Sequence, residues 1–364
     1  MHIYIVSLID PQDWFLAAGG GAGAGSGDGG HSVVIDGTGV SFPQEPGDTL
    51  LRAALRAGIG FPYECNSGGC GSCRFQVVEG EVDDRWPDAP GRSHRDRRTG
   101  RLLACQCCAT TDARIAVRPS PEYVPLVAPA RQSALLCHAE DLTHDLRLFR
   151  FATAGPASFL PGQYAVIDLL NGVSRCYSMS NLANDEGVWE FIVRRVPGGR
   201  ATSLLFDELA VGDEVELDGP YGLAWLRTDN DRDIVCVAGG SGLAPMLSIA
   251  RGAAEAGLLA TRELHFFYGA RTPADVCGGE LLAALGADAA RVHFHPVVSM
   301  PSTADAWDGA TGFVHEVARE MLGPAAADHE WYFAGPALMT QALQEMLAVE
   351  LLVPVGQIHF DRFC

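Results

Sequence analysis

Apolar and polar positions along the chain mark three stretches that differ in periodicity. The first ordered stretch opens with residues 31–36, which are rich in β-branched residues and end at an Asp-Gly turn. Residues 48–58 read as a helix that starts at a capping residue and stops at a glycine. Residues 74–78 and 115–117 have the composition of further strands, so this stretch mixes strands with a helix.

A second stretch contains only short β-like runs. Turn signals separate these runs at intervals that suit a small antiparallel barrel. The predicted strands cover residues 134–138, 145–150, 163–168, 189–194 and 214–218.

The sequence changes character near residue 233. The apolar run of residues 233–238 is followed by a glycine-rich turn and a helical stretch that starts at Ala244. Further strand candidates then alternate with helical segments, which favours a parallel, doubly wound sheet. These candidates cover residues 263–268, 291–298 and 330–333.

Low-complexity segments separate these stretches. Residues 17–30 are rich in glycine, and a linker is favoured over a phosphate loop because no strand precedes them. Residues 119–130 are rich in proline and form a second linker. The prediction is a multidomain α+β and α/β protein, with an extension over 1–30, a first domain over 31–118, a linker over 119–130, a barrel over 131–230 and an α/β domain over 231–364.

Composition narrows the class of protein. The net charge of −19 argues against a general nucleic-acid binder or a binder of anionic membranes. The 11 cysteines are too few for a disulfide scaffold and are odd in number, which indicates a reducing, cytoplasmic setting. No apolar run reaches transmembrane length, and the first 18 residues lack the basic region of a signal peptide. We therefore expect neither membrane insertion nor a signal peptide.

The strongest chemical signal is a set of four cysteines with the spacing C-x4-C-x2-C, followed after 31 residues by the fourth. This is the plant-type spacing for a [2Fe–2S] cluster, in which two irons require four thiolates. Zinc ions or free structural thiols are the alternative, but zinc sites more often use two C-x2-C halves. The cysteines are Cys65, Cys70, Cys73 and Cys105.

Residues 83–101 read as a polar loop that carries five arginines close to these cysteines. Such a loop is able to dock an acidic partner, but an ordinary solvated loop is the favoured interpretation. The arginines are Arg92, Arg95, Arg97, Arg98 and Arg101.

Residues 31–118 resemble a plant-type ferredoxin module, which has a β-grasp fold in that family. The resemblance rests on the stretches YECNSGGCGSC and LLACQ, and it makes the four cysteines the cluster ligands. Cys107 and Cys108 lie close to the fourth ligand, but the register after LLA favours Cys105.

The barrel carries the motif Arg175-Cys-Tyr177-Ser178, which resembles the flavin motif of the ferredoxin–NADP reductase superfamily. The resemblance implies that Arg175 pairs with the flavin pyrophosphate, Tyr177 stacks on the isoalloxazine and Ser178 bonds near N5. The order of the modules implies FAD as the flavin. That superfamily also binds the flavin through a P-G-G-x-x-[ST] loop and a C-terminal aromatic residue. The resemblance therefore implies further FAD-binding residues, which are Gly199, Arg200, Ala201, Thr202 and Phe363. A buried core role for Phe363 is nearly as well supported.

The α/β stretch resembles the nicotinamide-binding domain of the same superfamily. An acidic residue after the second strand suits the free ribose diol of NADH, so NADH is preferred over NADPH. Ala334 stands where many members carry a cysteine beside the nicotinamide. The implied NAD residues are Gly239, Gly240, Ser241, Gly242, Ala244, Pro245, Gly269, Arg271, Asp275, Gly335, Pro336 and Met339.

Residues 31–364 thus resemble the reductase component of multicomponent bacterial oxygenases. The implied activity passes electrons from NADH through FAD and a [2Fe–2S] cluster, one at a time, to an aromatic or alkane monooxygenase, and no residue acts as acid or base. A Rieske-type dioxygenase or a separate ferredoxin is the alternative acceptor. A non-catalytic iron–sulfur carrier or redox sensor is the alternative from a different class.

Overall fold

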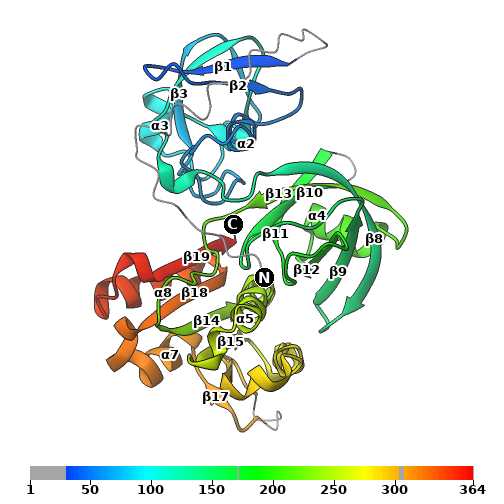
Figure 1. The fold of residues 1–364 in the computed structure, drawn as a ribbon, viewed down its shortest axis with the longest axis vertical. Helices are drawn as coiled ribbons and strands as arrows, with labels where there is room; N and C mark the ends of the chain where they lie inside the picture. Colours follow the sequence, from blue (N-terminus) through cyan, green and yellow to red (C-terminus); the bar gives the residue numbers. More distant parts are fainter. Residues whose placement is uncertain (1–29, 170–171, 303–306, 364) are drawn as a thin grey trace. The chain divides into compact units, whose positions relative to one another are not determined.

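The computed structural model describes residues 30–169, 172–302 and 307–363 (Figure 1). The chain divides into two compact units, Met1–Ala128 and Pro129–Cys364. Almost all of the extension predicted for residues 1–30 lies outside the described residues. Within the described part of the chain, no helix combines the length and the apolar character needed to cross a membrane.

The first unit is built on a mixed sheet with the strand order β2-β1-β7-β3-β5. Strands β1 and β7 are parallel and lie in its middle, while the other pairs are antiparallel. This is the expected β-grasp arrangement, and a short β4–β6 pair is added to it. The strands are β1 (His31–Ile35), β2 (Ser41–Gln44), β3 (Arg74–Glu79), β4 (Val82–Asp84), β5 (Leu102–Leu103), β6 (Cys107–Ala109) and β7 (Ala113–Ala116).

The helix predicted over residues 48–58 is α2 (Leu50–Arg56). Thr49 caps it, since its side chain accepts a hydrogen bond from the backbone N–H of Arg52. Leu50, Leu51 and Leu55 are fully buried, so the helix is anchored by its apolar face.

Residues 83–101 are not the plain polar loop that the sequence predicts. They contain the end of β4 and the helix α3 (His94–Arg98). A capping box begins α3: the Ser93 side chain accepts from the Asp96 N–H, and the Asp96 carboxylate accepts from the Ser93 N–H. The pattern was not recognised because α3 is short and Asp96 is the only one of its residues that is buried.

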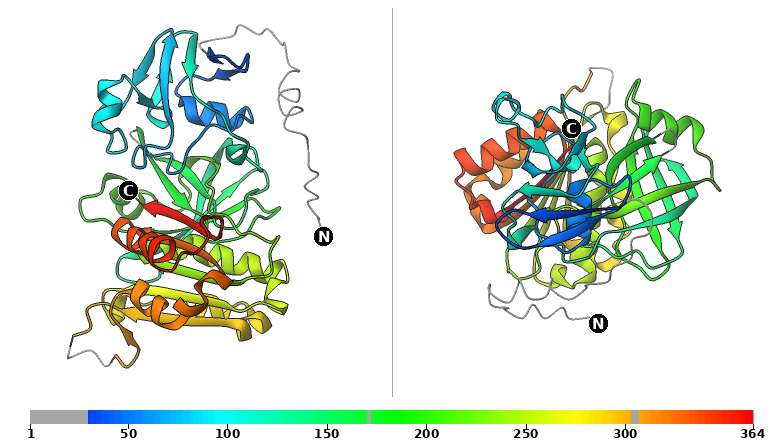
Figure 2. Two further views of the ribbon diagram at one scale, coloured as in Figure 1. Left: turned by 90° about the vertical axis from the view of Figure 1, so that its left-hand side faces the viewer. Right: turned by 90° about the horizontal axis from the view of Figure 1, so that it is seen from above.

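The second unit starts with a six-stranded antiparallel sheet of order β11-β10-β13-β8-β9-β12. Its edge strands meet through a bridge between Met179 and Phe191, which closes the expected barrel (Figure 2). Phe149, Phe151 and Trp189 fill its interior. The strands are β8 (Ala130–Asp141), β9 (Leu146–Thr153), β10 (Tyr164–Leu169), β11 (Val173–Ser178), β12 (Val188–Arg194) and β13 (Glu214–Tyr221), and the short helix α4 (Arg200–Ser203) follows β12.

A parallel sheet of order β17-β16-β15-β14-β18-β19 completes the second unit. Ile234 and Cys236 of β14 belong to one core cluster with residues of α5, whereas Val235 and Val237 belong to another with residues of α7 and α8. The order of strands reverses at β14, as in the doubly wound fold that was expected. The elements are β14 (Asp233–Gly239), α5 (Leu243–Glu255), β15 (Leu264–Ala270), α6 (Gly279–Ala283), β16 (Val292–Val298), β17 (Ala310–Thr311), α7 (Val314–Leu322), β18 (His329–Pro336), α8 (Ala337–Glu345) and β19 (Ile358–Phe363).

Candidate cofactor-binding sites

The four cysteine side chains of the first unit come together in two pairs. The Cys70 thiol hydrogen-bonds to Cys65 and lowers the pKa of Cys65 to about 5, and Cys73 lowers the pKa of Cys105 in the same way. No three of these sulfurs lie within 4.8 Å of one another among the described residues. A single tetrahedral zinc ion would hold four sulfurs about 3.8 Å apart. Two pairs instead fit two irons, each with two protein thiolates.

Backbone N–H groups point at these sulfurs. The N–H groups of Cys70 and Ser67 donate to the Cys65 sulfur at 3.3 and 3.5 Å, and that of Ser72 donates to the Cys70 sulfur at 3.4 Å. The Gln106 amide lies 3.6 Å from the Cys105 sulfur. Donors in this position stabilise negative charge on a cluster and raise its reduction potential.

The loop conformation depends on glycine at two positions. Gly68 and Gly71 have φ of 84° and 78°, a region that favours glycine. A Cβ on Gly71 would lie 2.3 Å from the carbonyl oxygen of Gly91, whose own N–H donates to Gly68. Asn66 is buried, and its two amide atoms have no hydrogen-bond partner in the described structure, which fits a side chain beside a site filled by a non-protein group.

The two additional cysteines point elsewhere. Cys108 donates from its sulfur to the carbonyl oxygen of Asp48 at 2.7 Å. Burial raises the pKa of Cys107 well above its ordinary value and that of Cys108 to about 11. Both therefore stay neutral thiols in β6, while Cys105 stands with Cys73.

In the second unit, a cavity of about 420 Å³ lies where β11 and β12 meet the carboxyl end of β14. Burial raises the pKa of Tyr177, so its phenol is neutral and suited to stacking. The cavity is lined by every residue predicted for FAD: Arg175, Tyr177, Ser178, Gly199, Arg200, Ala201, Thr202 and Phe363.

The P-G-G loop is fastened by Thr202. Its hydroxyl donates to the Gly199 carbonyl and accepts from the Val196 N–H, both at 3.2 Å. The Thr202 side chain therefore stabilises the loop itself. Helix α4 starts at Arg200 with no side-chain cap, which leaves its first N–H groups available to an anion.

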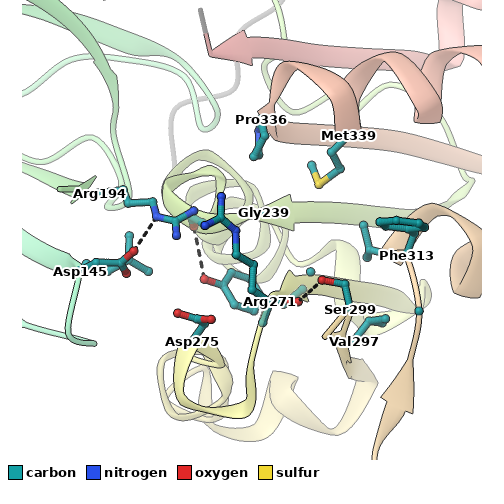
Figure 3. A pocket seen from close by; sticks show the side chains of 17 residues that line it. Asp145, Arg194, Gly239, Arg271, Asp275, Val297, Ser299, Phe313, Pro336 and Met339 are labelled. Atoms are coloured by element: carbon teal, nitrogen blue, oxygen red, sulfur yellow. Dashed lines mark hydrogen bonds and ion pairs between the residues drawn. The ribbon is translucent and has the colours of Figure 1, made fainter. Parts of the chain in front are cut away.

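A second cavity of about 150 Å³ lies at the carboxyl ends of β14, β15 and β18, where the strand order reverses (Figure 3). Seven of the residues predicted for NAD line it: Gly239, Gly240, Gly269, Arg271, Asp275, Pro336 and Met339.

The other predicted NAD residues are placed differently. Ser241 lines the first cavity, while Gly242, Ala244, Pro245 and Gly335 line neither of the two. A Cβ on Gly242 would lie only 1.9 Å from the carbonyl oxygen of Ala334, so this glycine allows α5 to approach β18. Ala244 and Pro245 are buried in the first turn of α5. These residues shape the crevice rather than face it.

The two cavities share one wall. Arg194, Gly239, Gly240 and Pro336 line both of them. Phe363 stands opposite Pro336 in the pairing of β18 with β19, so the C-terminal aromatic side chain borders the first cavity beside this wall. A ligand in one cavity therefore meets a ligand in the other across Gly239 and Pro336.

Sequence reasoning missed Arg194 of this wall and Asp145 of the second cavity. The Arg194 guanidinium donates to Asp145 at 2.7 Å, which joins β12 to the turn before β9 (Figure 3). Neither residue belongs to a motif, and only their strand positions were predicted. Tyr268 is buried at the end of β15, with its hydroxyl 3.5 Å from the Gly240 carbonyl.

Asp275 keeps one carboxylate oxygen for its own turn. That oxygen accepts from the N–H and hydroxyl of Thr272, both at 2.8 Å, in a capping box. The other oxygen lies 3.7 Å from the imidazole of His144. Arg271 and Asp275 both project into the cavity (Figure 3).

Comparison with known protein families gives three matches. A 2Fe-2S iron-sulfur cluster binding domain matches residues 33–110, an oxidoreductase FAD-binding domain residues 133–225, and an oxidoreductase NAD-binding domain residues 236–345. These matches show a [2Fe–2S] cluster binding domain, which includes the four cysteines, followed by FAD-binding and NAD-binding oxidoreductase domains.

Individual relatives span nearly the whole chain. This chain is 43% identical to the ferredoxin–NAD(P)+ reductase CarAd of Metapseudomonas resinovorans. The match covers 87% of this chain and 95% of that protein. It is 40% identical to the ferredoxin–NAD+ reductase component of the alkene monooxygenase system of Xanthobacter autotrophicus. That match covers 89% of this chain and 98% of the relative. The solved ferredoxin reductase in carbazole 1,9a-dioxygenase superposes with a TM-score of 0.84 at 37% identity and covers 92% of this chain and 99% of its own. The chain thus belongs to the family of iron–sulfur flavoprotein reductases that serve as ferredoxin–NAD(P)+ reductase components of oxygenase systems.

Proposed function

We propose that the chain takes electrons from NADH and delivers them singly, through its FAD and [2Fe–2S] sites, to the oxygenase component of a monooxygenase system. The observation that carries the proposal is the wall shared by the two cavities of the second unit. It lets a nicotinamide and a flavin ring approach each other, because Gly239 and Gly240 place no side chain between them.

When bound, FAD supplies the conversion between two-electron and one-electron chemistry, and the cluster supplies the one-electron outlet. The chain positions them. The Arg175 fork suits a pyrophosphate, the neutral phenol of Tyr177 offers a flat face for the flavin ring, and Phe363 covers the neighbouring edge of the cavity. Arg194 is held by Asp145 with its charge directed at the shared wall.

The preference for NADH rests on Asp275. Its carboxylate lines the cavity beside Arg271, where a ribose diol would accept or donate hydrogen bonds. A 2′-phosphate in the same place would meet this negative charge, and Arg271 is the only cation among the residues that line this cavity apart from Arg194, which Asp145 already engages. The charges that line this cavity therefore favour NADH, which lacks the 2′-phosphate.

A second immediate acceptor, a separate ferredoxin, is favoured by one finding. The relatives with 43% and 40% identity both bear the name ferredoxin reductase. In this case the chain reaches the oxygenase through an intermediate carrier, and the reactions inside the chain are unchanged.

Steady-state reduction of ferricyanide and of a one-electron protein acceptor tests the proposal. The holoprotein is expected to reduce both with NADH, and to have a kcat/KM at least about tenfold lower with NADPH. An equal kcat/KM for NADPH and NADH would contradict the proposed role of Asp275 in selecting the nucleotide. Failure to reduce either acceptor with NADH would overturn the proposed function.

A further inference from the structure

We propose that exposed arginines around helix α3 form the docking surface for an acidic electron-acceptor protein at the cluster. We call Arg95, Arg97, Arg98 and Arg101 the arginine face. The inference rests on the proposed function, because it concerns the partner that receives electrons from the cluster.

Charge is distributed unevenly along the chain. Residues 30–128 carry 11 arginines against 12 acidic residues, whereas residues 129–364 carry 15 arginines against 30 acidic residues. Five of the arginines of the first unit fall within residues 92–101, where Asp96 is the single acid. An acidic partner is repelled by most of this chain, so a local basic surface would both attract and orient it.

The arginine face is fixed beside the loop that holds the cluster cysteines. Arg74, the residue after Cys73, donates from Nε to the buried carboxylate of Asp96 at 2.8 Å. The segment before α3 also touches the loop, since the Gly91 N–H donates to the Gly68 carbonyl at 2.9 Å. The charges therefore keep a constant position relative to the thiols.

Within the described residues, the guanidinium groups of this face make almost no ion pairs or hydrogen bonds with the rest of the protein. Arg95, Arg98 and Arg101 are exposed, and none of them has an ion pair or a side-chain hydrogen bond within the described residues. Arg97 makes only a 3.7 Å contact with the exposed carboxylate of Asp88. Arg92, by contrast, is tied down, because it donates to Asp84 and to the Arg101 carbonyl at 2.9 Å each.

Arg95 and Arg98 are also neighbours on α3, three residues apart. Like charges at this spacing repel each other, so the pair carries a small electrostatic cost. A partner carboxylate between the two would offset that cost.

An exposed aromatic side chain lies next to the same loop. Trp86 is 43% exposed, and its ring is 3.1 Å from the position that a Cβ on Gly68 would occupy. Tryptophan and arginine are the residue types most enriched among those that dominate binding energy at protein interfaces. An aromatic contact at the cluster loop and a cationic surface beside it together describe an interface for another protein.

The test uses the full-length holoprotein with the double substitution Arg95→Glu/Arg98→Glu. The probes are an acidic Rieske-type ferredoxin, the basic protein cytochrome c, and ferricyanide. At low ionic strength we expect kcat/KM for the ferredoxin to fall by about tenfold or more and its dependence on salt to weaken. The values for cytochrome c should not fall, and that for ferricyanide should stay unchanged.

The control is Arg291→Glu/Arg319→Glu, which changes the net charge equally on the second unit, away from the carboxyl edge of its sheet. It should alter the ferredoxin value by less than about twofold. An equal fall in both variants, or no fall in the first, would overturn the inference.

Reduction inside the chain is followed in the same samples. If NADH reduces flavin and cluster normally in the double variant, a change with ferredoxin belongs to docking. If the variant slows reduction of the cluster by the flavin, the arginine face serves the second unit of the chain and the inference is wrong. If wild-type protein shows no reduction by NADH, the proposed function fails before docking is tested.

Discussion

At the scale of single residues, the site depends on a few charged and sulfur-containing groups whose environment sets their chemistry. Asp275 illustrates this, because one of its carboxylate oxygens holds its own turn, while the other lies 3.7 Å from His144 at the nucleotide cavity. The cysteines illustrate it as well: hydrogen bonds from Cys70 and Cys73 lower the pKa values of Cys65 and Cys105, while burial raises the pKa of Cys107.

Asp275→Asn is expected to relax the choice of nucleotide. The asparagine oxygen still accepts from Thr272, so the turn is kept while the negative charge is removed. We expect kcat/KM for NADPH to rise about tenfold and that for NADH to change less than threefold, measured with ferricyanide as acceptor. Glu280→Gln removes one exposed charge from the same domain and is the matched control. An unchanged ratio of NADPH to NADH efficiency would show that Asp275 does not select the nucleotide.

Cys65→Ser is expected to remove the cluster and leave the flavin. Iron content and visible absorption of the cluster should be lost, reduction of ferricyanide by NADH should remain, and reduction of a ferredoxin should stop. Cys107→Ala is the control, because this buried thiol stands apart from the two cysteine pairs. Loss of iron in the control with retention in Cys65→Ser would contradict the ligand assignment.

At the scale of elements, short local patterns were predicted well and long-range ones were not. The cysteine spacing and the Gly239–Gly242 turn were recognised because each motif lies within one loop. Arg194 and Asp145 were missed, since they come from separate strands and meet only in the folded barrel. Strand β19 was missed because its pairing with β18 spans many residues, although Phe363 on it was proposed from the resemblance.

Helix α3 gives a prediction about stability. Burial by itself raises the pKa of Asp96, but hydrogen bonds from Ser93 and the ion pair with Arg74 outweigh it and hold the pKa below its ordinary value. Asp96→Ala should lower the free energy of unfolding of the first unit by about 1–2 kcal/mol near pH 7. Thermal unfolding followed through cluster absorbance measures this.

The sign of the pH dependence follows from the lowered pKa. A depressed carboxyl pKa gives stability that is present above the unfolded value of about 3.9 and is lost as the pH falls through the folded value. The difference between wild type and Asp96→Ala should therefore shrink below about pH 4. A difference that grows on acidification would contradict the role given to this carboxylate, and Ser93→Ala should reproduce part of the effect.

At the scale of the whole molecule, residues 30–128, which carry the cluster cysteines, are nearly balanced in charge, whereas the flavin and nucleotide unit is strongly acidic. The three family matches follow one another along the chain in the order cluster, flavin, nucleotide. The sequence predicted this order because each module carries its own local motif. It did not reveal the arginine face as a surface, because that required the position of α3 beside the cluster loop.

The most direct measurement is an anaerobic visible spectrum of the purified holoprotein before and after addition of NADH, with NADPH as the comparison. We expect flavin and iron–sulfur bands to be present, and we expect both to bleach with NADH and to bleach more slowly with NADPH. Bleaching of flavin in a protein that has no iron–sulfur band would contradict the cluster assignment. Absence of bleaching with either nucleotide would contradict the proposal that electrons enter at the shared wall of the two cavities.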